Sequence, residues 1–303
     1  MQITRPLYSL INSISRRTGL FTRRQCVDVA ARVGKELVDM QKAGIKIDRN
    51  SCMYAVKKYV PQSDFKLIWG NKEIMESGDA CIKNYVAPNN NRLMGFYFKR
   101  ANIMVLRDGA IEKGVEIETF AHEFQHYLFD NNTPLFGSMT KRYRAIHPYN
   151  PEECARINKN TCSTPNFEKD LKDLLEPCKT DIRSRKDLIK YYAENTNLTS
   201  KERLEAYITS ICRYHFCRSI SSNVGELINQ IIRFKNEFNS YKVMDMIAKY
   251  KDKNATGHMK NALLYKEAIR VMKREIFKIL THQHPICSRK VLANRKLPSP
   301  VIG

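Results

Sequence analysis

The chain has 303 residues, 43% of them apolar, which is enough to bury a sizeable core in one large domain or two modest ones and excludes disorder of the whole. Its 52 Lys and Arg against 31 Asp and Glu give a formal charge of +21, which favours polyanionic partners such as nucleic acid, an anionic lipid surface or an acidic protein. No zinc-finger, basic-zipper or RNA-binding signature accompanies the charge, so a solvated basic surface explains it equally well. No apolar run approaches the roughly 18 residues that cross a bilayer.

The nine cysteines are odd in number and form no C-x-x-C pair, which excludes a zinc ribbon and a thioredoxin-type site. We expect free thiols in a reducing, cytoplasmic location. Disulfides among Cys154, Cys162 and Cys178 are the alternative for an oxidising compartment.

The first 22 residues are basic and free of acids, and they predict a mobile tail, with a secretion or transit leader over residues 1–25 as the alternative. Residues 23–43 carry apolar side chains at helical spacing and end at Gly44, which predicts a helix. Three short apolar runs separated by turn residues then predict a small sheet. These runs are FKLIW (65–69), MGFYF (94–98) and ANIMVLR (101–107).

The next stretch, EIETFAHEFQHYLFDNN (116–132), contains the pattern H-E-x-x-H. On a helix its apolar residues form one stripe, whereas His122 and His126, one turn apart, fall on nearly the opposite side beside Glu123. Two imidazoles so placed can converge on one Zn²⁺, and the neighbouring carboxylate can take a proton from water held there. The alternative is a pair of ordinary exposed or hydrogen-bonded histidines. The residues of the apolar stripe are Ile117, Phe120, Ala121, Phe124 and Leu128.

Residues 134–165 are polar and broken by prolines, which predicts an irregular connection with one short helix. Helical periodicity then continues almost to the end of the chain. The expected helices are 166–175, 180–194, 200–219, 224–239 and 258–281.

Strands followed by TFAHEFQHYLF on a helix and then by further helices resemble the zincin metallopeptidases. The resemblance covers about residues 90–130 and one downstream helix. The metzincin subclass, which continues with x-x-G-x-x-H, is excluded because Tyr127 to Asn132 contain neither that glycine nor that histidine. The gluzincin-like subclass takes a Glu from a later helix as its third ligand, and the resemblance implies such a residue here.

The segment TSKERLEAY (199–207) offers two glutamates. Glu202 completes a capping box with Thr199, so it already has a structural role. Glu205 borders an apolar stripe, where a carboxylate needs a charge partner. It also precedes Ala, as in the ligand helix of several gluzincin-like peptidases, although Tyr207 stands where Asp or Asn is commoner. We expect Glu205 as the third ligand, with Glu202 and Glu153 as alternatives.

Tyr207, Tyr214 and His215 are candidates for stabilising an oxyanion. Their spacing in the sequence does not show which of the three would have this role. The group His282, His284 and Cys287 has acceptable ligand types but no fourth partner, so incidental polar residues explain it better.

The order of these elements predicts an α+β, mostly helical fold, with a small sheet upstream of the active-site helix and a helical C-terminal region. The expected function is zinc-dependent hydrolysis of peptide bonds through a zinc-bound water activated by Glu123. The alternative is a non-catalytic basic protein that binds nucleic acid or an anionic surface. The expected parts are a tail (1–22), a part with the sheet and motif helix (23–133), a helical part with the third ligand (134–282) and a loose basic tail (283–303).

Overall fold

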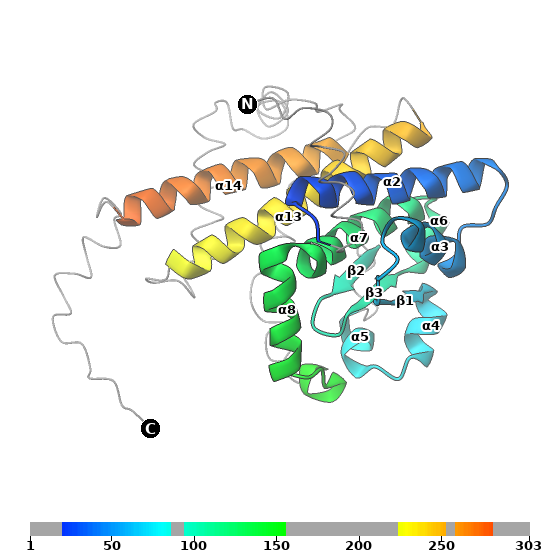
Figure 1. Cartoon of the computed structure of the whole chain (residues 1–303), viewed down its shortest axis with the longest axis horizontal. Helices are drawn as coiled ribbons and strands as arrows, with labels where there is room; N and C mark the ends of the chain where they lie inside the picture. The colour runs from blue at the N-terminus through cyan, green and yellow to red at the C-terminus, as the bar shows by residue number, and fades with distance from the viewer. Residues whose placement is uncertain (1–19, 86–93, 156–223, 253–257, 281–303) are drawn as a thin grey trace, which may run out of the picture. The chain divides into compact units, whose positions relative to one another are not determined.

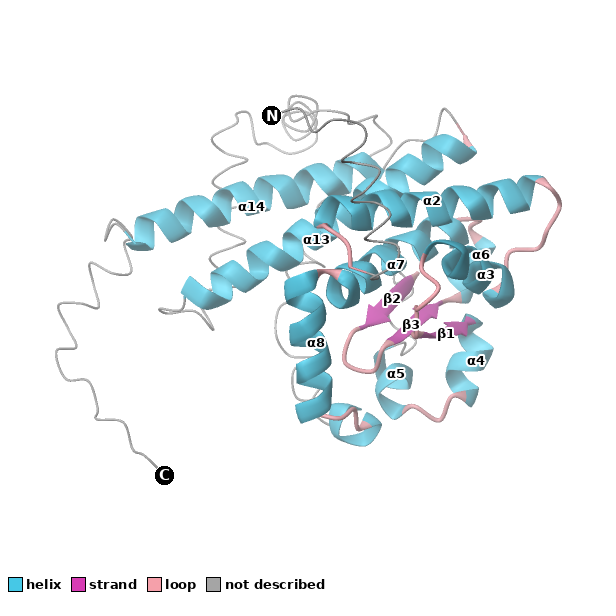
Figure 2. Ribbon diagram, viewed as in Figure 1, coloured by secondary structure: helices cyan, strands magenta, loops and turns pink. Residues whose placement is uncertain are grey.

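The computed structural model describes residues 20–85, 94–155, 224–252 and 258–280 (Figure 1). These residues form helices and a three-stranded sheet (Figure 2), which confirms the expected α+β, mostly helical class. They belong to two compact units. The first contains residues 20–85, 94–155, 239–252 and 258–262, and the second contains 224–238 and 263–280.

Helix α2 (Arg23–Lys42) opens the first unit, as the sequence predicts. It begins at a reciprocal capping box in which the Thr22 side chain accepts from the Gln25 backbone N–H and Gln25 accepts from that of Thr22. The helix ends before Gly44, whose φ of +79° only glycine adopts readily. Helix α3 (Arg49–Tyr59) follows and is capped by Asp48.

The predicted sheet is present, with strand order β1-β3-β2. Strand β3 (Ile103–Leu106) is central and pairs parallel with β1 (Lys66–Trp69) and antiparallel with β2 (Gly95–Phe98). All four residues of β3 are buried because both faces of the sheet are covered. Met104 and Leu106 face the core shared with α7 (Glu116–Asn132), whereas Val105 faces the opposite side. That side is covered by the short helices α4 (Gly70–Glu76) and α5 (Ala80–Tyr85), and α6 (Asp108–Glu112) precedes α7.

Helix α7 is the centre of the first unit and contacts α2, β2 and β3. The rings of Phe120 and Phe124 stack at 6.1 Å between centroids and are fully buried. Helix α2 comes close because Gly34 presents no side chain: a Cβ there would lie 3.3 Å from the Ala121 Cβ and 2.2 Å from Ile247 Cδ1. This position therefore brings three helices together.

The connection after α7 is more regular than predicted, because α8 (Pro134–Ile146) is a 13-residue helix. Pro134 at its first position suits a helix start, where a backbone N–H is not needed. The helix forms despite the prolines of this stretch because they lie at or beyond the ends of α8.

Helix α13 (Val224–Lys251) runs twelve residues beyond the expected end at 239, and α14 (His258–Leu280) matches its prediction. In the first unit, Val243 and Ile247 of α13 belong to the same core as α2 and α7. In the second unit, Phe234 of α13 meets Tyr265 of α14 edge to face at 5.4 Å. None of the described helices combines the length and the apolar composition that a membrane span requires.

Candidate metal centre

The two faces of α7 are as the sequence predicts. The five stripe residues, Ile117, Phe120, Ala121, Phe124 and Leu128, are all fully buried in the core. Because the helix is surrounded, the opposite side is also largely enclosed: His122 and Glu123 are each only 8% exposed. The motif therefore lies in a mostly water-excluded setting, where charges interact strongly.

The side chains of His122 and His126 point their Nε2 atoms toward each other. Their Nε2 atoms lie 3.1 Å apart. Two nitrogens bound to one tetrahedral zinc at about 2.05 Å would be separated by about 3.3 Å. The observed separation therefore fits two ligands of one ion, with a small adjustment of the rings.

Glu237 of α13 is the third member of this group. Its carboxylate oxygen and the ligand nitrogens of His122 and His126 all lie within 4.8 Å of one another. Tyr241 follows Glu237 by one helical turn on the same helix. The Tyr241 ring packs edge to face on His122, with 4.8 Å between centroids. Two imidazoles and a carboxylate make up a common donor set of catalytic zinc sites.

Glu123, the expected base, is held by the sheet. Its Oε2 accepts a 2.7 Å hydrogen bond from the backbone N–H of Tyr97 on β2, and its Oε1 lies 3.9 Å from Nε2 of His122. Strand β2 forms the edge of the described sheet, so its outer N–H groups are available to α7. One oxygen of the carboxylate is thus fixed while the other lies beside the His122 imidazole.

Ser240 of α13 and His258 of α14 each interact with a residue of the motif helix. Ser240 donates a hydrogen bond to Gln125 of α7, the residue directly before His126. Burial lowers the pKa of His258, with a smaller contribution from nearby His122, and Asp245 opposes both effects. His258 is therefore a third imidazole in the electrostatic range of the centre.

Glu237, Tyr241 and Asp245 are not among the residues predicted from the sequence, although their spacing is informative. These residues recur at intervals of four, so on one continuous helix they share a face. The pattern was hidden because the helix was expected to stop at 239.

Several predicted site residues lie outside the described residues. Of the alternatives for the third ligand, Glu153 is described and is exposed; its backbone N–H donates to Asn150. Among the described residues it is not part of the histidine group. The residues outside are Glu202, Glu205, Tyr207, Tyr214, His215, His282, His284 and Cys287.

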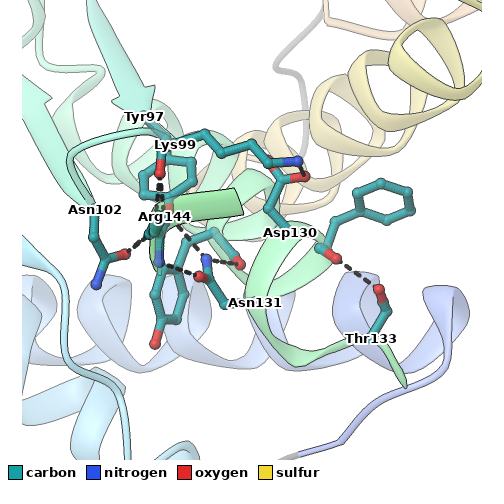
Figure 3. A network of polar contacts seen from close by, with 9 residues as sticks. Tyr97, Lys99, Asn102, Asp130, Asn131, Thr133 and Arg144 are labelled. Carbon is teal, nitrogen blue, oxygen red and sulfur yellow. Dashed lines mark hydrogen bonds and ion pairs between the residues drawn. The ribbon is translucent and has the colours of Figure 1, made fainter. Parts of the chain in front are cut away.

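A polar network anchors the strand that holds Glu123 (Figure 3). Arg144 of α8 donates to the Tyr97 hydroxyl at 2.7 Å and to Oδ1 of Asn131 at 2.8 Å, and it also bonds the backbone carbonyl of Lys99. Asn131 in turn donates to the Tyr97 hydroxyl at 2.8 Å. Burial raises the pKa of Tyr97 above its ordinary range, so this hydroxyl stays protonated. The network joins α7, α8 and β2 at the C-terminal end of α7.

Comparison of the chain with protein-family models, with curated proteins and with solved structures finds no match.

Proposed function

We propose that this protein is a zinc-dependent peptidase of the zincin type. His122, His126 and Glu237 are the metal ligands in this proposal, and Glu123 is the general base. The observation that carries it is the convergence of two imidazoles and one carboxylate within 4.8 Å, with a second carboxylate beside them. If the two histidines were on the helix surface by chance, neither the Glu237 nor the Glu123 carboxylate would need to lie beside them.

The donor set favours zinc or another transition metal over Ca²⁺ and Mg²⁺. Ca²⁺ and Mg²⁺ prefer oxygen ligands, whereas imidazole suits zinc and other transition metals. Zinc, when bound with one position open, supplies a Lewis acid and lowers the pKa of a water molecule to about 7.

The protein residues supply the remaining requirements of hydrolysis. Glu123 takes the proton of the attacking water and returns it to the leaving amine. The backbone N–H of Tyr97 bonds Oε2 of Glu123 and keeps this carboxylate in place during both transfers. The other oxygen, Oε1, stays available to take and return the proton. The low exposure of His122 and Glu123 limits competing water around the reacting groups.

In this proposal the third ligand is Glu237, whereas the sequence predicted Glu205. Glu237 is preferred because its carboxylate is placed with the histidines and because Tyr241, one turn along, packs on His122. Glu205 stays a prediction.

Metal content tests the proposal. The purified full chain should hold one zinc per molecule, measured by elemental analysis after dialysis. His122→Ala and Glu237→Gln should each lower zinc affinity by tenfold or more, whereas Glu205→Gln and Glu118→Gln should not. Glu118 is the control carboxylate, because it lies on α7, the helix that carries both histidines, but pairs with Lys251, at 3.8 Å.

Hydrolysis tests the reaction. A peptide library prepared from a digested proteome should gain new N-termini on incubation with the zinc-loaded protein, and a chelator should stop this. A protein that binds no zinc and keeps its thermal midpoint in chelator would overturn the proposal and favour the basic binding protein.

A further inference from the structure

Two cysteines far apart in the sequence meet away from the histidine group. Cys81 lies in α5, and Cys154 lies in a helical stretch, residues 151–155, beyond α8. Their Sγ atoms are 2.7 Å apart, and both side chains are buried, at 1% and 5% exposure. Ordinary non-bonded contacts between heavy atoms are about 3.5–4.0 Å for carbon, whereas a disulfide measures about 2.05 Å. The sulfurs thus need to approach by only about 0.7 Å to bond.

The surrounding residues hold this junction independently of the sulfurs. The Tyr149 hydroxyl donates to the Asp79 carboxylate, with distances of 2.7 and 2.8 Å to its two oxygens. Asp79 also accepts from the backbone N–H of Ile82 at 2.9 Å, which fixes the start of α5. A small apolar cluster encloses the sulfurs. Both cysteines are therefore positioned by contacts that exist before any covalent bond forms.

We propose that Cys81 and Cys154 are a redox modification site that forms a disulfide in the folded protein. Glutathione disulfide, or another low-molecular-weight disulfide, is the oxidant. One cysteine thiolate attacks the glutathione disulfide and releases one glutathione; the other thiolate attacks the mixed disulfide and releases the second. Two protein thiols lose two protons and two electrons, and one glutathione disulfide becomes two glutathiones.

The burial of the two cysteines determines the rate of this reaction. Burial raises the pKa of the Cys81 thiol to about 12, with its Cys154 neighbour contributing in the same direction. Little thiolate is present at neutral pH, so oxidation should be slow and should accelerate with pH. The same burial shields the finished bond from reductants.

The bond would enclose the region that carries the motif. The loop from Cys81 to Cys154 contains β2, β3, α7 and α8, and so includes His122, Glu123 and His126. A link between its ends restricts the unfolded chain and stabilises the fold. The thermal midpoint of the oxidised protein should rise by roughly 5–15 °C. This proposal does not depend on zinc or on peptidase activity.

The test uses the full wild-type chain in glutathione buffers of graded oxidised-to-reduced ratio at pH 8, brought to equilibrium. Free thiols are then blocked with iodoacetamide in denaturant, and unreduced peptides are mapped by mass spectrometry. A peptide joining Cys81 to Cys154 should appear, while Cys26 and Cys52, also buried, should be alkylated and serve as internal controls. Cys81→Ser and Cys154→Ser should each abolish the rise in midpoint.

Three results would overturn the proposal. The first is full alkylation of both cysteines at the most oxidising ratio, and the second is glutathione adducts on either without a link between them. The third is pairing of Cys154 with Cys162 or Cys178. Each result is read on the wild-type chain, so it stands even if a serine variant fails to fold.

Discussion

The backbone N–H of Tyr97 on β2 holds Oε2 of Glu123 on α7 at 2.7 Å. The sheet, and not the histidine pair, thereby sets the position of this carboxylate. A backbone donor cannot be lost by changing the Tyr97 side chain, so side-chain variants can separate the position of Glu123 from its chemistry.

Glu123→Gln should keep zinc bound and abolish hydrolysis. The Gln side-chain oxygen can still accept from the Tyr97 N–H, but the amide cannot take a proton from water. We expect a loss of at least about 100-fold in kcat/KM, measured on a peptide cleaved by the wild type, with an unchanged zinc content. Normal turnover by this variant would show that Glu123 is not the base.

Tyr97→Phe should lower stability while leaving zinc binding and activity close to wild type. The change removes the hydroxyl that accepts from both Arg144 and Asn131 but keeps the backbone N–H that binds Glu123. The free energy of unfolding should fall by about 1–3 kcal/mol, because two half-buried donors lose an acceptor and Asn102 loses the donor of its hydrogen bond. Urea denaturation measures this.

Tyr54→Phe is the matched control for that change, because Tyr54 is 63% exposed. It should alter stability by less than about 0.5 kcal/mol. Equal effects of the two substitutions would contradict the assigned role of the network.

Gly34→Ala should destabilise the protein by about 1–3 kcal/mol, since the added Cβ would overlap the Ile247 side chain. Ile247→Val in the same chain removes the methyl that lies 2.2 Å from that Cβ and should recover part of the loss. A double-mutant cycle of these two changes measures the coupling. Strict additivity would show that α13 does not pack on α2 at this position.

Glu118→Gln should flatten the dependence of stability on pH. Burial raises the pKa of Glu118 above its ordinary value, although Lys251 opposes the effect. The folded state therefore holds this proton more tightly than the unfolded chain does. The resulting stabilisation is complete below the unfolded pKa, about 4.3, and is lost as pH rises through the folded value.

Urea unfolding of wild type and Glu118→Gln between pH 4 and 7 measures this difference. The wild type should lose stability relative to the variant as pH rises through that window. Glu112→Gln, at an exposed position of α6, should run parallel to the wild type. An opposite slope for Glu118→Gln would mean that the carboxylate is stabilised in its charged form.

The local sequence determined α2, the three strands and the two sides of α7, because each depends on periodic burial within one segment. The stripe that includes Phe120 and Phe124 had to face a core, and this left His122, Glu123 and His126 together on the remaining side. The capping residues Thr22 and Gln25 likewise act within one turn of chain. Such features need no knowledge of distant residues.

Tertiary structure alone decided which residues gather around the two histidines. Glu237 lies 111 positions beyond His126 in the sequence, and no local pattern states which helix will face the motif. The close packing at Gly34, the Tyr97 bond to Glu123 and the meeting of Cys81 with Cys154 are of the same kind. Contacts of this type arise when separate segments bury their apolar faces against each other, and their partners are fixed only by that packing.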